Sequence, residues 1–265
     1  MTDLVQDDAA GPRLTHRQRV RLSTIEEIKT VARAQVLAEG VGGLSLRAVA
    51  REIGLPPSGI YRFFSSREEL VTALRAAAYD AAAQALHDAL ESAGKPSDHV
   101  TRWLSVQDAY RSWGIRNATD FALVFGLPAD VQPGGPSESD AASEPVEGED
   151  AREPDPTIAA AERFAFELFR PFTEMLEDGT IDLSRATIQT AASVTGRFAA
   201  FVEETGQLSP HAVAVALGAW AGLHGWVSLE AFGHLSSLVA DSDQLFKAHA
   251  LGLLGAIGCD PALLP

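Results

Sequence analysis

The pattern of apolar and polar positions is most informative between residues 45 and 64. Across residues 46–53, apolar side chains recur at i, i+3, i+4 and i+7, which predicts a helix with one buried face. Gly54 follows where a helix needs a residue with positive φ in order to end. Pro56 and Pro57 prevent continuation but fit the first turn of a new helix. The pattern therefore predicts two short helices joined by a tight turn.

The second predicted helix turns Ile60 and either Phe63 or Phe64 inward, and it leaves a small, polar and cationic face exposed. That exposed face consists of Ser58, Gly59, Tyr61 and Arg62. Such side chains suit a groove lined with phosphates and base edges. As the only long cation on this face, Arg62 is the candidate for reading guanine, and Tyr61 is the candidate for a phosphate contact. An ordinary helical hairpin is the alternative, but the flanking residues favour a DNA reader.

Hydroxyl caps and apolar stripes predict a further helix on each side of this pair. The first starts at Ser23 or Thr24, each followed three residues later by a glutamate, and it ends at Gly40. The second starts after Ser65 or Ser66 and is long and rich in alanine. Three short helices make too small a core for much stability alone, so we expect the long helix to anchor them to the rest of the chain.

Six further apolar segments predict a helical body. They cover residues 98–115, 121–125, 157–177, 182–203, 210–228 and 241–257. The last two are nearly uncharged, and a helix that is apolar on most faces is buried on most faces. The chain has too few other helices to cover both, so we expect a second copy to cover them. No uncharged apolar run of about 18 residues is apparent, so no membrane span is expected.

Charge is divided unevenly along the chain, whose formal net charge is −15. Residues 11–75 hold eleven Lys or Arg against six Asp or Glu, a net of +5, so the remaining residues carry −20. Because salt screens charges beyond about 8–10 Å, affinity for DNA depends on the local face rather than on the distant acid. Residues 130–156 are rich in Pro, Gly, Ser, Glu and Asp, which predicts a disordered acidic loop.

The expected organisation is an arm and two domains. Residues 1–22 form a flexible basic arm, residues 23–75 a three-helix DNA-binding domain, and residues 76–265 a helical regulatory and dimerisation domain. The arm is either a solvated tail or a contact to phosphates or to a minor groove. Its basic residues are Arg13, His16, Arg17, Arg19 and Arg21.

The sequence offers few groups for catalysis. Cys259 is the single cysteine, which excludes an intrachain disulfide and fits a reducing cytoplasm. Phosphate-cradling glycine loops, nucleophile elbows and His/Glu pairs at metal spacing are absent from the sequence. His224 stands among packing residues and is not expected to bind metal. We expect no enzymatic activity and no cofactor.

Longer motifs add a family resemblance. They are Ser45, Arg47-Ala48-Val49-Ala50, Gly54, Ser58-Gly59-Ile60-Tyr61, Phe64 and Ser66-Arg67-Glu68-Glu69-Leu70 near the N-terminus, and the Trp-His-Gly pattern of Trp220, His224 and Gly225 later in the chain. The first 80 or so residues resemble the TetR family of bacterial transcriptional regulators. The C-terminal half resembles a ligand-binding body of that family known for the Trp-His-Gly pattern.

The resemblance implies an all-α homodimer whose two helix-turn-helix heads enter successive major grooves of a palindromic operator. Carried over by position, the DNA-binding residues are Ser45, Arg47, Pro57, Ser58, Gly59, Tyr61, Arg62 and Arg67. Two positions depart from the family pattern. Phe63 stands where many members have histidine, which removes a polar phosphate contact, and Arg67 replaces a frequent lysine, which keeps the charge but changes the geometry.

The resemblance also implies a pocket in each body, where a small and apolar molecule changes the separation of the heads. Aromatic candidates for its lining are Trp103, Tyr110, Trp113, Phe164, Phe172 and Trp220. Candidates for the dimer interface are Trp220, Leu223, His224, Gly225, Phe246 and Leu253.

The sequence is therefore interpreted as a cytoplasmic, DNA-binding transcriptional regulator, a ligand-responsive repressor that binds its operator as a dimer. One alternative is a DNA-binding regulator without a small-molecule effector. The other is a helical protein that binds small molecules and carries a vestigial helix-turn-helix.

Overall fold

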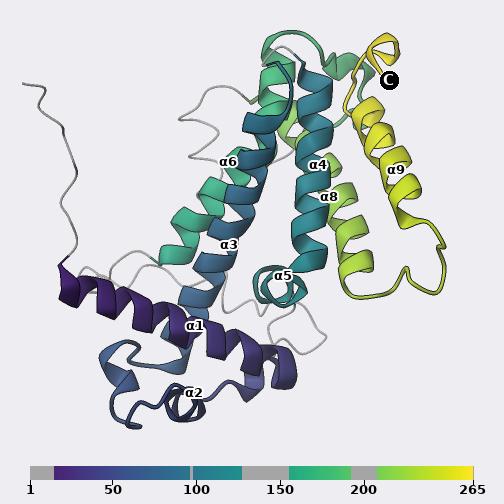
Figure 1. The fold of residues 1–265 in the computed structure, drawn as a ribbon. Helices are drawn as coiled ribbons and strands as arrows, with labels where there is room; N and C mark the ends of the chain where they lie inside the picture. Colours follow the sequence, from purple (N-terminus) through teal and green to yellow (C-terminus); the bar gives the residue numbers. More distant parts are fainter. Residues whose placement is uncertain (1–14, 96–97, 127–154, 192–207, 265) are drawn as a thin grey trace, which may run out of the picture. The chain divides into compact units, whose positions relative to one another are not determined.

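The computed structural model describes residues 15–95, 98–126, 155–191 and 208–264. The chain forms two compact units, residues 1–71 and 72–265. In the described residues both units are built from helices, and the one β-type pairing is an isolated bridge between Ile181 and Cys259. The predicted all-α class is confirmed (Figure 1). Nearly all of the predicted acidic loop lies outside the described residues.

In the N-terminal unit, helix α1 (His16–Gly43) begins earlier than the predicted start at Ser23 or Thr24. The Thr15 hydroxyl accepts a hydrogen bond from the backbone N–H of Gln18 at 3.2 Å, and the Gln18 carboxamide oxygen accepts one from the Thr15 N–H at 2.8 Å. This capping box lies upstream of the apolar stripe, so periodicity alone misses it. As a result, three cations assigned to a flexible arm lie on a helix: Arg17, Arg19 and Arg21.

The segment after helix α2 (Leu46–Glu52) differs from the prediction of a second α-helix. Gly54 has φ of +72° and makes the expected turn, but the chain then forms turns and a single 3-10 turn, η1 (Ile60–Arg62). The N–H groups of Gly59 and Phe63 each donate to the carbonyl three residues earlier, at 2.7 and 2.9 Å. Such tight bonding suits short pieces of chain only.

The core of this unit is formed by buried apolar side chains from each of its helical segments. They include Ile28, Ala32, Val49, Ala50, Ile60, Phe64 and Leu70. Phe64 rather than Phe63 is the buried aromatic, and Phe63 is half-buried. Ser66 caps the next helix, α3 (Arg67–Ser92), by accepting from the N–H of Glu69 at 3.1 Å.

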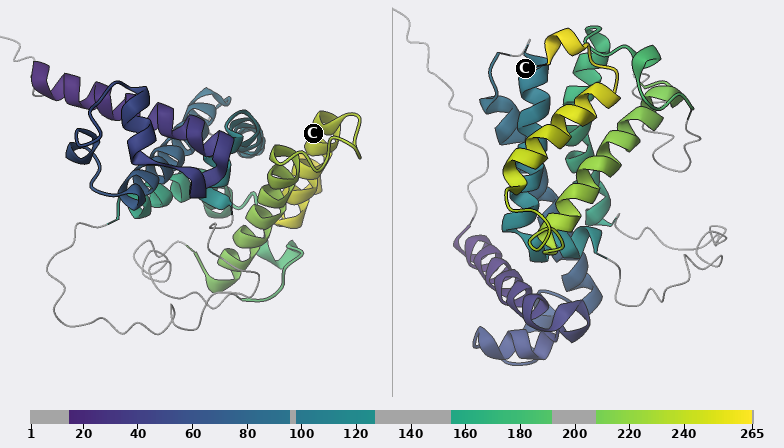
Figure 2. Two further views of the ribbon diagram at one scale, coloured as in Figure 1. Left: turned by 90° about the horizontal axis from the view of Figure 1, so that it is seen from below. Right: turned by 90° about the vertical axis from the view of Figure 1, so that its right-hand side faces the viewer.

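In the C-terminal unit, long helices lie side by side (Figures 1 and 2). They are α4 (His99–Arg116), α6 (Pro156–Glu177), α8 (Pro210–Ala231) and α9 (Ser242–Ala256), with the short helix α5 (Ala118–Phe125) after α4. Each long helix starts where a side-chain oxygen accepts a backbone N–H, at Asp98, Asp155, Ser209 and Asp241. These four predicted helices are confirmed, with ends that agree within three residues.

One predicted helix is wrong in the part that can be seen. Within the predicted range 182–203, residues 182–191 contain only the 3-10 turn η2 (Leu183–Arg185), and residues 192–203 lie outside the described residues. The Asp182 carboxylate accepts from the N–H of Ser184, two residues on, which favours a tight turn. A second 3-10 turn, η3 (Pro261–Leu263), follows α9.

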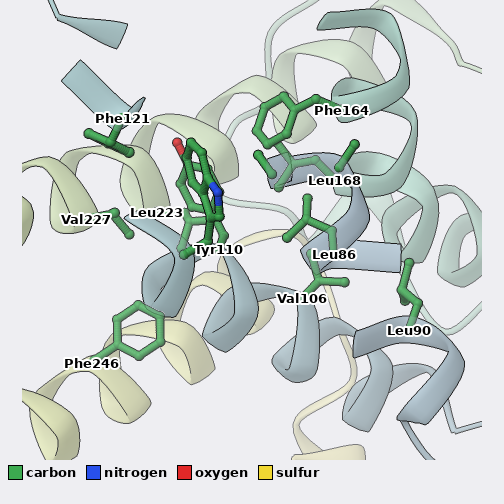
Figure 3. Close-up of a cluster of buried hydrophobic side chains, with 13 residues drawn as sticks. Leu86, Leu90, Val106, Tyr110, Phe121, Phe164, Leu168, Leu223, Val227 and Phe246 are labelled. Carbon is green, nitrogen blue, oxygen red and sulfur yellow. The ribbon is translucent and has the colours of Figure 1, made fainter. Parts of the chain in front are cut away.

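Helix α4 supplies the centre of the core in this unit. Tyr110 is fully buried, and its ring centroid lies 5.7 to 6.4 Å from those of Trp113, Phe121 and Phe164. Figure 3 shows Tyr110 in this cluster of buried side chains, together with Phe121 and Phe164. Burial raises the pKa of the Tyr110 hydroxyl, so this group stays protonated.

Next to it, Arg111 joins α4 to both C-terminal helices. Its guanidinium donates to both carboxylate oxygens of Glu230 on α8, at 2.7 and 2.6 Å, and to Asp243 on α9 at 2.6 Å. It also lies 4.8 Å from the ring centroid of Phe246. The Arg111 hydrogen bond holds the pKa of Glu230 below its usual value. These charge-assisted bonds fix the register of three helices.

Helix α8 carries no Asp, Glu, Lys or Arg between Pro210 and Leu229, so the expectation that no uncharged apolar run exists is wrong. By length and composition alone, α8 is long and apolar enough to cross a membrane. It contacts α4 and α9 along its length, and seven of its residues are buried. Core helices of soluble proteins pass the same test, so the feature is weak support for a membrane span.

Gly114 of α4 packs tightly against α8. A Cβ at this position would lie 2.6 Å from Cγ1 of Val227 and 3.1 Å from the Phe121 ring. We expect Gly114→Ala to lower the free energy of unfolding by about 1 kcal/mol or more, since overpacking outweighs the better helix propensity of alanine. Gly255→Ala is the matched control, because a Cβ there meets nothing within 4 Å. Thermal unfolding checks both variants, and an unchanged midpoint for Gly114→Ala would contradict this packing.

Candidate DNA-binding interface and effector site

The predicted DNA-binding residues of α2 lie at its exposed start. Ser45 and Arg47 are both exposed. The Ser45 hydroxyl accepts from the N–H of Ala48 at 3.4 Å, and the Ser45 N–H donates to the Gln35 carboxamide at 3.3 Å. Ser45 therefore has a structural role as the N-cap of α2, in addition to the predicted contact.

Four of the predicted residues are exposed together on the recognition turn, which we define as residues 56–62. They are Pro57, Ser58, Tyr61 and Arg62. Gly59 is half-buried, and a Cβ there would lie 3.0 Å from the Pro56 carbonyl oxygen. Gly59 thus has a steric role in the turn itself, because a Cβ there would crowd that oxygen.

The structure gives Arg67 a partner inside the unit. Its Nη2 donates to the carbonyl oxygen of Val41 at 2.5 Å, and its Nη1 lies 3.6 Å from Glu68 Oε1. The guanidinium therefore caps the C-terminal end of α1, where free carbonyls attract cations. A phosphate contact by Arg67 remains a prediction. A substitution of Arg67 would remove the bond to Val41 as well, so its effect on stability must be measured separately from its effect on DNA binding.

Arg21 of α1 reaches the recognition turn, which its sequence position does not reveal. Its guanidinium carbon lies 5.2 Å from the ring centroid of Phe63, and its Nη1 donates to the carbonyl oxygen of Arg62 at 3.2 Å. The aromatic ring that replaces the expected histidine thus holds a cation beside Arg62. The sequence shows that Arg21 belongs to a basic cluster, but it does not indicate that this residue contacts Phe63.

Three of the six predicted pocket residues line one cavity between α4, α6 and α8. These are Trp103, Phe172 and Trp220. The other three belong to the aromatic core around α4: Tyr110, Trp113 and Phe164. The cavity lining also includes Gln107, a nearly completely buried side chain that the sequence pattern did not single out.

Two of the six predicted interface residues are buried inside the protomer, which corrects the prediction for those two, and the assignment of the other four stays a prediction. Leu223 and Phe246 are 1 % and 2 % exposed, Trp220 lines the cavity, and Leu253 packs against the core and lies 2.7 Å from the Cβ position of Gly222. Only Gly225 is exposed. Because α8 is apolar all round, its periodicity does not distinguish its inner face from its outer face.

His224, the remaining residue of that set, sits in the aromatic core. Its Nδ1 lies 2.8 Å from the Tyr110 hydroxyl, and its Nε2 lies 3.3 Å from the Ser228 hydroxyl. Burial lowers the pKa of the His224 imidazole, which favours the neutral ring. In the described ranges no group of three or more His, Cys, Asp or Glu side chains is arranged to hold a metal ion.

Comparison with known families agrees with this division into a DNA-binding head and a helical body. Residues 28–74 match the model for bacterial regulatory proteins of the tetR family, and residues 103–253 match the tetracyclin repressor-like C-terminal domain. The chain belongs to the TetR family. It is therefore a transcriptional regulator with a helix-turn-helix DNA-binding domain, as the sequence resemblance predicted.

Curated relatives and solved structures cover almost the whole chain. The HTH-type transcriptional regulators Mb1846 of Mycobacterium bovis and Rv1816 of Mycobacterium tuberculosis are each 29% identical over 258 residues, 96% of this chain and 99% of theirs. A crystal structure described as that of a regulatory protein, SCO4313, superposes with a TM-score of 0.61 at 28% identity, over 91% of this chain and 100% of that one. A Rhodococcus sp. RHA1 protein of unknown function, 22% identical, shares the fold with a TM-score of 0.61, over 96% and 100% of the two chains.

The contact between Arg21 and Phe63 predicts a coupled effect on DNA binding. We expect Arg21→Ala to weaken binding to the DNA upstream of the protein's own gene, and to reduce the slope of log K against log salt by about 0.9, because one phosphate contact is lost. Phe63→Leu should cause a loss of about two- to fivefold, the size of an exposed cation–π contact. In the Arg21→Ala background, Phe63→Leu should add nothing.

Fluorescence anisotropy at several salt concentrations measures these effects. Lys247→Ala removes an exposed cation of α9 and is the control. Additive losses from Arg21→Ala and Phe63→Leu would show that the ring does not act through Arg21.

Proposed function

We propose that the protein is a ligand-responsive repressor that binds a palindromic operator as a homodimer in the cytoplasm. The exposed cationic recognition turn carries this proposal, because it presents Arg62 and Tyr61 on a head of TetR type. The +5 charge of residues 11–75 supports binding to a polyanion, despite the acidic remainder of the chain. The cavity of the C-terminal unit supports an effector site.

Dimerisation is supported by uncharged exposed residues on the two C-terminal helices. We define the outer face as the exposed residues Leu217, Ala221 and Gly225 of α8 and Leu245, Ala248 and Gly252 of α9. All six are uncharged and four are small, which allows helices to approach closely. A Cβ at Gly225 or Gly252 would meet nothing within 4 Å inside the protomer. In a twofold-symmetric dimer the same face of both protomers meets, so each outer face would shield the other from solvent.

The single experiment that tests the proposed function is a salt titration on DNA upstream of the protein's own gene. A reader with several phosphate contacts should lose affinity steeply between 50 and 200 mM salt. Absence of binding at 50 mM salt would overturn the proposed function and favour a helical small-molecule binder.

The role of Arg62 separates base reading from phosphate contact. We expect Arg62→Ala to reduce the preference for the cognate sequence over scrambled DNA by about 1–3 kcal/mol, the value of a bidentate contact to guanine. Arg67→Ala should weaken binding to both DNAs about equally. Because Arg67 also caps α1, the thermal unfolding midpoint of the Arg67→Ala variant must be measured together with its DNA binding. Equal losses on both DNAs from Arg62→Ala would remove Arg62 as a base reader.

The outer face makes a separate prediction for oligomeric state. We expect Gly225→Leu to shift the protein from dimers to monomers in sedimentation velocity, because the new side chain separates the two α8 helices. Lys247→Leu introduces the same side chain at another exposed position of α9 and should remain dimeric. Circular dichroism checks that both variants stay helical. A dimeric Gly225→Leu variant would place the interface elsewhere.

A further inference from the structure

The recognition turn has few hydrogen bonds of its own, because it is not an α-helix. The N–H groups of Gly59 and Arg62 donate to the carbonyl oxygens three residues earlier, at 2.7 and 3.3 Å. Bonds of this spacing have poorer geometry than α-helical bonds and occur in short runs only. The exposed side chains of Tyr61 and Arg62 therefore depend on contacts at the ends of the turn for their positions.

The upstream end of the turn is fixed by α2. The N–H of Leu55 donates to the carbonyl oxygen of Ala50 at 2.8 Å, so the chain leaves α2 in a defined direction. Near the downstream end, Phe64 is buried in the core, and Arg21 donates to the carbonyl oxygen of Arg62 at 3.2 Å. The chain beyond Phe64 still has to be joined to α3.

Glu69 of α3 makes that connection through Ser65, the residue that follows Phe64. Its carboxylate oxygen Oε2 accepts from both the backbone N–H and the hydroxyl of Ser65, each at 2.6 Å. These bonds hold the pKa of Glu69 below its usual value, so the group is ionised at neutral pH. Bonds to a charged acceptor are shorter and stronger than neutral ones. The carboxylate thus ties the exit of the recognition turn to the first turn of α3.

A carboxylate beside a DNA-binding surface also repels phosphates, and this gives the two possible effects of Glu69 opposite signs. If repulsion were its main effect, removing the charge would tighten binding to any DNA. If its bonds to Ser65 matter more, removing them would weaken the recognition of sequence. The geometry favours the second effect, since both bonds are directed at the chain that leaves the recognition turn.

We propose that Glu69 is a positioning residue for sequence recognition, which acts through Ser65 to hold the recognition turn in the orientation that reads base edges. A turn that is fixed in advance loses less conformational entropy when it meets its cognate sequence. Contacts to phosphates carry no sequence information and depend less on this orientation. The inference rests on the proposed base reading by the recognition turn, and it adds the residue that orients this turn.

The test compares binding of full-length variants to the DNA upstream of the protein's own gene and to scrambled DNA, by fluorescence anisotropy. We expect Glu69→Ala to reduce the preference for the upstream DNA about two- to tenfold, the size of one net hydrogen bond. Its affinity for scrambled DNA should stay the same or rise, because a negative charge is removed. Glu69→Gln keeps an acceptor oxygen and should lose less preference, and it preserves the test if Glu69→Ala does not fold.

Glu68→Gln is the matched control, because it removes the same charge from the same turn of α3, where Glu68 pairs with Arg67. It should keep the wild-type preference. Ser65→Ala should reduce the preference less than Glu69→Ala does, and should add nothing in the Glu69→Ala background. Equal losses on both DNAs from Glu69→Ala would indicate a loss of stability alone and would overturn the proposal, as would additive losses from Ser65→Ala and Glu69→Ala.

Hydrogen exchange tests the anchor in the absence of DNA. The N–H groups of Phe63 and Phe64 donate to the Ile60 carbonyl oxygen at 2.9 and 3.0 Å, and they should exchange faster in Glu69→Ala than in Glu68→Gln. Equal exchange in the two variants would overturn the proposal.

The same variants separate this inference from the proposed function. A wild-type preference that survives in Glu69→Ala would overturn the role of Glu69 alone, while the proposed function stands. If the wild-type protein binds neither DNA, the proposed function fails and the role in recognition fails with it, even where faster exchange shows that the anchor exists.

Discussion

The C-terminal unit depends on the ion pairs of Arg111, which hold α4, α8 and α9 in one register. A nearly buried guanidinium is tolerable only because Glu230 and Asp243 both accept from it and Phe246 covers its face. Removing Glu230 would leave Arg111 with the exposed Asp243 as its one remaining carboxylate partner on these helices. Helix α8 contributes residues to both the cavity wall and the outer face, so the positions of both depend on this register.

Helix α8 serves two surfaces at once, and its composition reflects this double use. Its inner side packs Leu223 and Val227 into the core, and Gly114 of α4 lets the two backbones come close. Its outer side exposes Leu217, Ala221 and Gly225. If the proposed dimer covers the outer side, neither side of α8 needs charged residues, which accounts for its likeness in composition to a membrane span.

The sequence predicts much of the fold, because apolar periodicity is a local signal. The helix starts predicted at residues 98, 157 and 210 agree with those of α4, α6 and α8 within one residue. The start of α1 is not predicted, because the capping box of Thr15 and Gln18 precedes the apolar stripe of that helix. At the candidate site, exposure of Tyr61 and Arg62 is predictable from periodicity. Tertiary contacts cannot be predicted in this way. No local pattern indicates that Arg21 lies over Phe63, or that Gln107 is buried without a hydrogen-bond partner.

The contacts that hold Arg21 and Arg67 have a thermodynamic consequence for the proposed interface. Both guanidinium groups are already ordered in the DNA-free protein, by a ring face and by backbone carbonyls. A guanidinium has five N–H donors, so one internal bond leaves others for phosphate. Contacts of this kind restrict the rotamers of both side chains before DNA binds, so less free energy is spent on immobilising them at binding.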